Sequence, residues 1–254
     1  MTWHIQDSNV GNLGDYLKHF YLIKLVDSVT KQAPAAPIAY VDTHAGAGVY
    51  SMKNKHWENR NSNRELVNNS DAEWRIFDRL NPNIDEKHEY LGSFVLVGRF
   101  LAEKEGVNSE LIIFENDDDV VKRIKEKAAP YLPKYNLGPF GKSDPVSVKI
   151  KMSELKSSSF QKIICLIDPY SANKAWADLL DYNPEGCFIL LFDFSNKPDN
   201  GDFEWNFGER IPIDWKPDLD RGKKKGYALF GNRNAQDLLR GYNSLDFKEK
   251  RASI

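Results

Sequence analysis

The chain has 254 residues, 41% of them hydrophobic, so it can bury one sizeable core. Its formal net charge of −2 gives no global signature of nucleic-acid binding, so a polyanionic partner would have to bind local basic patches. No apolar run is long enough to span a bilayer, and the N-terminal residues do not resemble a signal peptide. We therefore expect a cytoplasmic protein rather than a membrane protein. We also expect a monomer.

The first predicted element is a helix that begins after Asn12, a favourable N-cap residue, and runs to about Thr30. It is apolar on nearly every face, so we expect it to be buried. Asp15, Lys18 and His19 interrupt this pattern, and their spacing places them on one side of the helix. A buried cation needs a partner, which is either Asp15 itself or the carboxylate of a ligand.

A short strand over residues 38–42 leads into a turn that contains Gly46 and Gly48. Glycines at alternate positions after a strand let the backbone approach a ligand closely. In nucleotide-binding sheets, an acid that binds the ribose hydroxyls follows the second strand about 20 residues further on. The best candidate is Glu115, which lies much further away and therefore implies an insertion.

The insertion covers residues 49–92 and is predicted to form a small helical subdomain, with short helices over residues 72–80 and 86–91. Its first part is basic and includes Lys53 and Lys55, and a second basic run covers residues 221–225. Both are candidate surfaces for a polyanion, although a solvated loop gives the same pattern.

The remaining predicted elements alternate between strands and helices, which is typical of an α/β sheet. We expect strands over residues 111–114, 146–150, 163–167, 188–194 and 226–230. We expect helices over residues 94–102, 117–127, 174–181 and 234–242, the first of them capped by Ser93. Cys165 and Cys187 lie in strand-like runs without the spacing of metal ligands, so we expect neither a metal site nor a disulfide.

The buried strand over residues 163–167 ends on Asp168, Pro169 and Tyr170. Ligands of open α/β sheets bind outside the carboxyl ends of the strands. Asp168 and the carbonyl of Pro169 suit the two hydrogens of an amine such as adenine N6, while Tyr170 would stack on a base taken out of its helix.

The strand, the glycine turn, Glu115 and this motif together predict a Rossmann-like methyltransferase that uses S-adenosylmethionine. The turn would admit the methionine part of the cofactor, Glu115 would accept the ribose hydroxyls, and residues near Met152 would pack on the adenine.

Two segments carry a more specific resemblance: Asn9-Val10-Gly11-Asn12-Leu13-Gly14-Asp15-Tyr16-Leu17-Lys18-His19 and Asp42-Thr43-His44-Ala45-Gly46-Ala47-Gly48. They resemble the signature segments of the RlmJ family, which methylates N6 of an adenine in large-subunit ribosomal RNA with S-adenosylmethionine. The resemblance implies a class I methyltransferase domain over residues 1–48 and 93–254, with the inserted helical subdomain at 49–92. It places these residues at the cofactor or the reacting centre: Lys18, His19, His44, Gly46, Gly48, Ser93, Glu115 and Asp168. On the substrate side we place His4, Asn12, Lys53 and Lys55.

The chain departs from this family at the motif itself, because the family's Asp-Pro-Pro-Tyr is Asp168-Pro169-Tyr170-Ser171 here. The altered motif also resembles the three-Cys-motif partner proteins. His4 replaces a family tyrosine, and Lys151-Met152 stands where an acid is expected after the third strand. Three alternatives to an RNA methyltransferase therefore stay open: a DNA adenine methyltransferase, a cofactor- or nucleic-acid-binding module without turnover, and a dinucleotide-dependent oxidoreductase. The last fits least, since Asp-Pro-Tyr has no role in hydride transfer.

Overall fold

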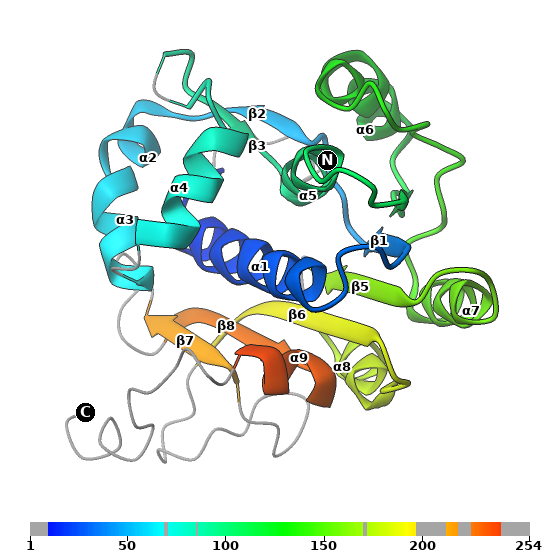
Figure 1. Ribbon diagram of the computed structural model, residues 1–254. Helices are drawn as coiled ribbons and strands as arrows, with labels where there is room; N and C mark the ends of the chain where they lie inside the picture. Colours follow the sequence, from blue (N-terminus) through cyan, green and yellow to red (C-terminus); the bar gives the residue numbers. More distant parts are fainter. Residues whose placement is uncertain are drawn as a thin grey trace.

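A mixed sheet with helices on both faces forms the centre of the computed structural model, which describes residues 10–68, 71–84, 86–169, 172–196, 212–217 and 225–239 (Figure 1). The six strands are ordered β4-β1-β5-β6-β8-β7. Their bounds are β1 Ile38–Asp42, β4 Ser109–Ile113, β5 Lys162–Ile167, β6 Cys187–Asn196, β7 Asp214–Pro217 and β8 Lys225–Gly231. Strand β8 is antiparallel to β6 and β7, and the other neighbouring pairs are parallel. The predicted α/β fold is confirmed.

Helix α1 (Leu13–Gln32) is buried over 15 of its 20 residues, as its apolar sequence predicts. The side chain of Asn12 caps it, because its oxygen accepts hydrogen bonds from the amides of Gly14 (2.7 Å) and Asp15 (3.2 Å). Helices α1, α5 (Ser93–Ala102) and α9 (Arg233–Leu239) cover one face of the sheet, and α7 (Pro145–Lys156) and α8 (Lys174–Ala177) cover the other. None of the helices in the described part of the chain is long and apolar enough to cross a membrane.

The insertion leaves the sheet through β2 (Val49–Ser51) and returns through β3 (Glu89–Leu91), which pair as an antiparallel ribbon. Between them lie α2 (Asn54–Glu58), α3 (Arg60–Val67) and α4 (Asp71–Leu80). The rings of Trp74 and Phe77 in α4 lie 5.9 Å and 5.8 Å from the ring of Tyr16 in α1. Helix α1 therefore lies between the inserted helices and the sheet, and all three share one core (Figure 1).

The prediction of a strand over residues 146–150 is wrong, because these residues belong to helix α7. Asp144 caps this helix by accepting the amide of Ser147 (2.9 Å), and Pro145 occupies a first-turn position that favours helix initiation. The strand-like pairing beside β4 occurs earlier, at Gly141. Its amide donates to the carbonyl of Ile113 (2.9 Å), and its carbonyl accepts from the amide of Glu115 (3.1 Å).

Two further predictions are corrected in and after the insertion. The helix expected over residues 86–91 is strand β3, and it follows His88, whose φ of 52° is incompatible with a helix. Ser93 does not cap α5, since Gly92 occupies the N-cap position without a side-chain bond and Ser93 points to Asp42 instead. The helix expected over residues 234–242 is found as α9, and residues 240–242 lie outside the described part of the chain.

The shared core predicts how the chain unfolds. Phe77 is fully buried between α1 and β3, so Phe77→Ala should lower the free energy of unfolding by about 3–5 kcal/mol. Because the insertion shares its core with the sheet, urea unfolding followed by circular dichroism should stay a single transition. The control is Leu66→Ala in α3, where the side chain is 45% exposed and the expected change is below about 0.5 kcal/mol. A separate early transition in the Phe77 variant would contradict a shared core.

Candidate functional site

The strand order reverses beside β1, and this is where the candidate site lies. The chain passes from β1 to β4 on one side and then to β5 on the other side, which makes the gap between β1 and β5 a topological switch point. Asp42 ends β1, Glu115 follows β4, and Asp168 follows β5. Because these strands are parallel, the structure brings the predicted residues Glu115 and Asp168 to one edge of the sheet, together with the glycine turn.

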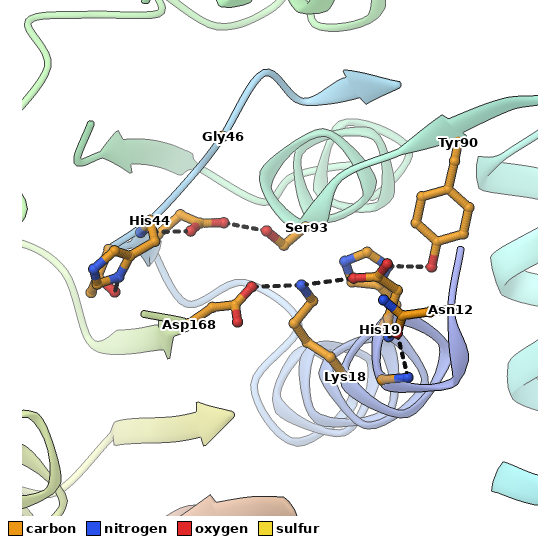
Figure 2. A network of polar contacts seen from close by, with 12 residues as sticks. Asn12, Lys18, His19, His44, Gly46, Tyr90, Ser93 and Asp168 are labelled. Atoms are coloured by element: carbon orange, nitrogen blue, oxygen red, sulfur yellow. Dashed lines mark hydrogen bonds and ion pairs between the residues drawn. The ribbon is translucent and has the colours of Figure 1, made fainter. Parts of the chain in front are cut away.

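Lys18 of α1 reaches this edge and lies between two carboxylates (Figure 2). Its Nζ is 2.6 Å from Oδ2 of Asp168 and 3.2 Å from Oδ1 of Asp15, and the residue is 7% exposed. Burial alone would lower the pKa of Lys18, but the charges of Asp168 and Asp15 outweigh it and raise the pKa above its ordinary value. The lysine thus stays cationic. Of the two partners considered from the sequence, Asp15 and the carboxylate of a ligand, the structure shows Asp15. It adds Asp168 as a second partner.

His19 lies beside Lys18 but faces β3. Its Nδ1 is 2.7 Å from the hydroxyl of Tyr90, and the two rings stack with centroids 5.4 Å apart. Burial and the neighbouring Lys18 hold the pKa of His19 well below its ordinary value, so the imidazole is neutral. Among the residues that the structure describes, Nε2 of His19 has no hydrogen-bond partner, which leaves one buried polar atom for a ligand or water.

Asp42 forms a second buried network at the end of β1. Its Oδ2 accepts hydrogen bonds from Ser93 Oγ (2.5 Å) and Tyr40 Oη (2.9 Å), and its Oδ1 accepts the amide of His44 (3.3 Å). Burial raises the pKa of Asp42 to about 6. The hydroxyl of Ser93, a residue predicted to contact a cofactor, thus donates its hydrogen bond to Asp42. Sequence reasoning did not assign Asp42 to the site, although an acid that ends a fully buried strand is a signal for such a network.

The glycine turn uses its amide groups within the protein. The amide of His44 binds Asp42, that of Ala45 binds the carbonyl of Phe114 (3.3 Å), and that of Gly46 binds Glu115 Oε2 (3.2 Å). The first amides of the turn are therefore bonded within the protein, and the carbonyl of Gly48 accepts the amide of Gly92 (2.7 Å). The phenol oxygen of Tyr50 in β2 lies against the turn, because a Cβ atom built on Gly46 would be 2.1 Å from it. Tyr50 was not predicted from the sequence, and its position two residues after the last glycine was the available signal.

Glu115 is half-buried and closes the other side of the turn. Besides the amide of Gly46, it accepts the amides of Asn116 (2.8 Å) and Asp117 (3.0 Å) through Oε1. A carboxylate has about four acceptor positions, so Glu115 keeps capacity for a further donor. An acid does follow the strand-like segment beside β4, because Asp144 comes three residues after Gly141, where it caps α7.

Other predicted residues lie away from Asp168. Met152 is fully buried in α7, where it belongs to the core between this helix and the sheet. The ring of His44 packs edge-on against Trp176 of α8 (4.7 Å), on the opposite side of Asp168 from His19 (Figure 2). Asn12 caps α1, and Lys53 and Lys55 are exposed at the start of α2.

Pro169 is half-buried beside Asp168. His4, Tyr170, Ser171 and most of the basic run at 221–225 lie outside the described residues. A groove of about 770 Å³ lies between α7 and α8, and none of the predicted site residues lines it. We therefore define the candidate site by the contacts among residues at the strand ends, and not by this groove.

Comparison with known proteins gives a fold rather than a function. No family model matches the chain, and no curated protein matches it. Among solved structures, the chain is similar to protein LPL1258 from Legionella pneumophila str. Philadelphia 1, which carries the family label DUF519, with a TM-score of 0.58. The match covers 92% of this chain and 93% of that protein at 16% sequence identity, so nearly the whole α/β fold is shared.

The ion pair at this edge can be measured as a coupling energy. In a double-mutant cycle of Lys18→Met and Asp168→Asn, we expect about 1–3 kcal/mol of coupling in the free energy of unfolding, because the cation is buried. Lys18→Met should cost more than Asp168→Asn, because it leaves both carboxylates without their cation. The matched control is Lys31→Met, whose 72% exposed side chain pairs with Asp27 and should contribute less than about 1 kcal/mol. A coupling energy near zero would contradict the geometry.

Asp42 predicts a pH dependence of stability. Its pKa is about 6 in the folded chain against an ordinary 3.8, so between these values the unfolded state loses the proton first. The free energy of unfolding should therefore fall as pH rises from 4 to 6, by up to about 3 kcal/mol from this group. Asp42→Asn should remove that fall, as measured by urea unfolding at pH 4, 5, 6 and 7. Parallel profiles for the two proteins would refute the assignment.

Proposed function

We propose that this chain is an S-adenosylmethionine-dependent nucleic-acid methyltransferase that acts on N6 of adenine in RNA. The observation that carries the proposal is the placement of Asp168, fixed by Lys18, across the switch point from a glycine turn whose first amides, of His44, Ala45 and Gly46, are already bonded. The Rossmann-like class I sheet and the relation to the RlmJ family are part of this proposal.

The turn distinguishes between two kinds of cofactor. A dinucleotide binds its phosphates through N–H groups of the turn and a helix N-terminus. Here the amides of His44, Ala45 and Gly46 are bonded within the protein, and the turn leads into strand β2 rather than a helix. A cofactor with an amino-acid part fits better, since the turn's carbonyls accept from its ammonium group and Lys18 binds its carboxylate. Glu115 would take the ribose hydroxyls.

Asp168 is suited to the reacting amine. The cofactor, when bound, supplies an electrophilic methyl group on its sulfonium. Lys18 binds one oxygen of Asp168, Oδ2, and so fixes the carboxylate while acceptor capacity remains for a hydrogen of the amine. The Pro169 carbonyl is placed next in the chain to take the second hydrogen. The protein contributes chiefly by holding the amine in line with the methyl group.

Support for a nucleic-acid substrate comes from the inserted helices. Lys53 and Lys55 are exposed at the start of α2, and the guanidinium of Arg60 lies 4.3 Å from the ring of Trp57. Exposed cations of this kind suit the phosphates of a nucleic acid. The acid at Asp144 also fits the resemblance to the RlmJ family, and this resemblance favours RNA over DNA.

Cofactor binding and methyl transfer test the proposal separately. Calorimetry should show binding of S-adenosylmethionine and not of NAD, and a tritiated methyl group should pass to total RNA. Asp168→Ala should lower transfer by at least about 10²-fold while cofactor binding stays within a few-fold, because the carboxylate acts on the amine. The control is Asp181→Ala, at an exposed position after α8, which should transfer normally.

Each alternative gives a different result. Transfer to DNA alone would make the chain a DNA adenine methyltransferase, and cofactor binding without transfer would make it a silent binding module. Binding of NAD alone would overturn the proposal. Full activity of the Asp168 variant would place the reacting amine elsewhere.

A further inference from the structure

Helix α7 carries an apolar patch on the face of the sheet opposite α1 (Figure 1). Val146 and Ile150 lie one turn apart and are 68% and 56% exposed. Both are β-branched and therefore form helices less readily than Ala or Leu, so their presence does not favour the helix itself. The groove of about 770 Å³ runs along them, and Ala175 and Leu179 of α8 line its other wall. The patch is thus shaped to receive another helix.

The groove is lined from one side by a stripe of α7, which we call its outer face. The members of the outer face are all exposed and recur at intervals of three and four residues: Val146, Lys149, Ile150, Ser153, Glu154 and Ser157. The large aliphatic side chains and the cation lie in the first half of this stripe, and the serines and the anion lie in the second half. The two halves therefore have opposite size and opposite charge.

This pattern makes the outer face complementary to itself when two copies are antiparallel. A two-fold axis between positions 151 and 152 would place Ile150 opposite Ser153 of the second copy, and Val146 opposite Ser157. It would also place Lys149 opposite Glu154, twice in the pair. A parallel arrangement would instead place each lysine beside the same lysine, so the charges favour the antiparallel one.

The two serines can be covered without leaving a donor unpaired. The hydroxyl of Ser153 donates to the carbonyl of Lys149 (3.0 Å), and the hydroxyl of Ser157 donates to the carbonyl of Ser153 (3.0 Å). Because these bonds lie within the helix, an aliphatic side chain packed on the serines removes no hydrogen bond to water that the protein fails to replace.

The charges of the outer face are available to a second copy. Lys149 forms no ion pair with any residue that the structure describes. Glu154 has a long and exposed contact with Lys151, 3.5 Å between Nζ and Oε2, which contributes little in water. An antiparallel copy would supply Lys149 with an anion and Glu154 with a second cation.

We propose that the outer face of α7 is the interface of a homodimer, in which the second copy binds with its own α7 antiparallel in the groove. The homodimer replaces the monomer expected from the sequence. The inference is independent of the proposed function, because none of the predicted site residues lines the groove and each subunit keeps its own candidate site.

Sedimentation velocity of the full chain at concentrations about 100-fold apart tests the dimer, since its population follows mass action. Wild type should pass from monomer to dimer. Ile150→Ala should raise the dissociation constant of the dimer at least about tenfold, because it removes apolar area from the interface. The matched control is Leu66→Ala, another exposed aliphatic position (45%) far from the groove in sequence, which should leave the dissociation constant unchanged.

Charge reversal tests the antiparallel arrangement. Lys149→Glu and Glu154→Lys should each weaken the dimer at least about tenfold, because either change places like charges opposite each other twice. An equal mixture of the two variants should restore the wild-type dissociation constant, since each then faces the opposite charge. The control is Lys122→Glu, an exposed position in α6 (Asp118–Arg123), which should dimerise like wild type. Circular dichroism checks that every variant is folded.

Three results would overturn the inference. Wild type that stays monomeric at the highest concentration would remove the dimer. A dimer that Ile150→Ala and both charge reversals leave unchanged would use another surface. Charge reversals that each weaken the dimer without recovery in the mixture would refute the antiparallel pairing of Lys149 with Glu154.

Discussion

A buried cation between two carboxylates fixes the geometry of this molecule. Lys18 extends from α1 to the end of β5, and it tolerates burial only because Asp15 and Asp168 are both within 3.2 Å. Helix α1 must therefore cross the sheet with its first turns at the carboxyl edge, where Asn12 caps it and the amide of Gly11 holds Asp15 (2.9 Å). One ion pair thus connects helix α1 with the strand that carries the candidate reacting group.

The glycine turn depends on several elements at once. Asp42 of β1, and Phe114 and Glu115 after β4, each accept an amide of the turn, and the hydroxyl of Tyr50 in β2 lies against Gly46. Its shape is therefore determined by contacts between segments far apart in the sequence, and not by its glycines alone. The insertion takes part in this arrangement, because the β2–β3 ribbon presses Tyr50 against the turn while α4 shares its core with α1. A change in the packing of the inserted helices would therefore shift the ribbon, and with it the contact between Tyr50 and the turn.

Sequence reasoning succeeded where local rules decide the structure. The cap at Asn12, the apolar α1 and the strand ends at Glu115 and Asp168 follow from capping, periodicity and parallel topology. It failed where two local rules conflict: alternating Val146, Val148 and Ile150 predict a strand, but the Asp144-Pro145 start favours the helix that forms. Met152 was misplaced with that strand. Tyr50 and the Asp42–Ser93 bond were missed because they depend on long-range packing, which one sequence does not display.

Two acids at one edge of the sheet have different environments, and this difference separates their roles. Asp42 is fully buried, its oxygens are bonded to Tyr40, Ser93 and His44, and its pKa is raised to about 6. The side chain of Asp168 is 20% exposed, and one of its oxygens is bonded to Lys18. Of these two acids, Asp168 is therefore the one that is accessible to a ligand. The negative charge of Asp168 contributes to the raised pKa of Asp42, while Lys18 opposes this effect. The cation therefore serves both acids: it anchors the accessible carboxylate and limits the electrostatic cost of burying the other one beside it.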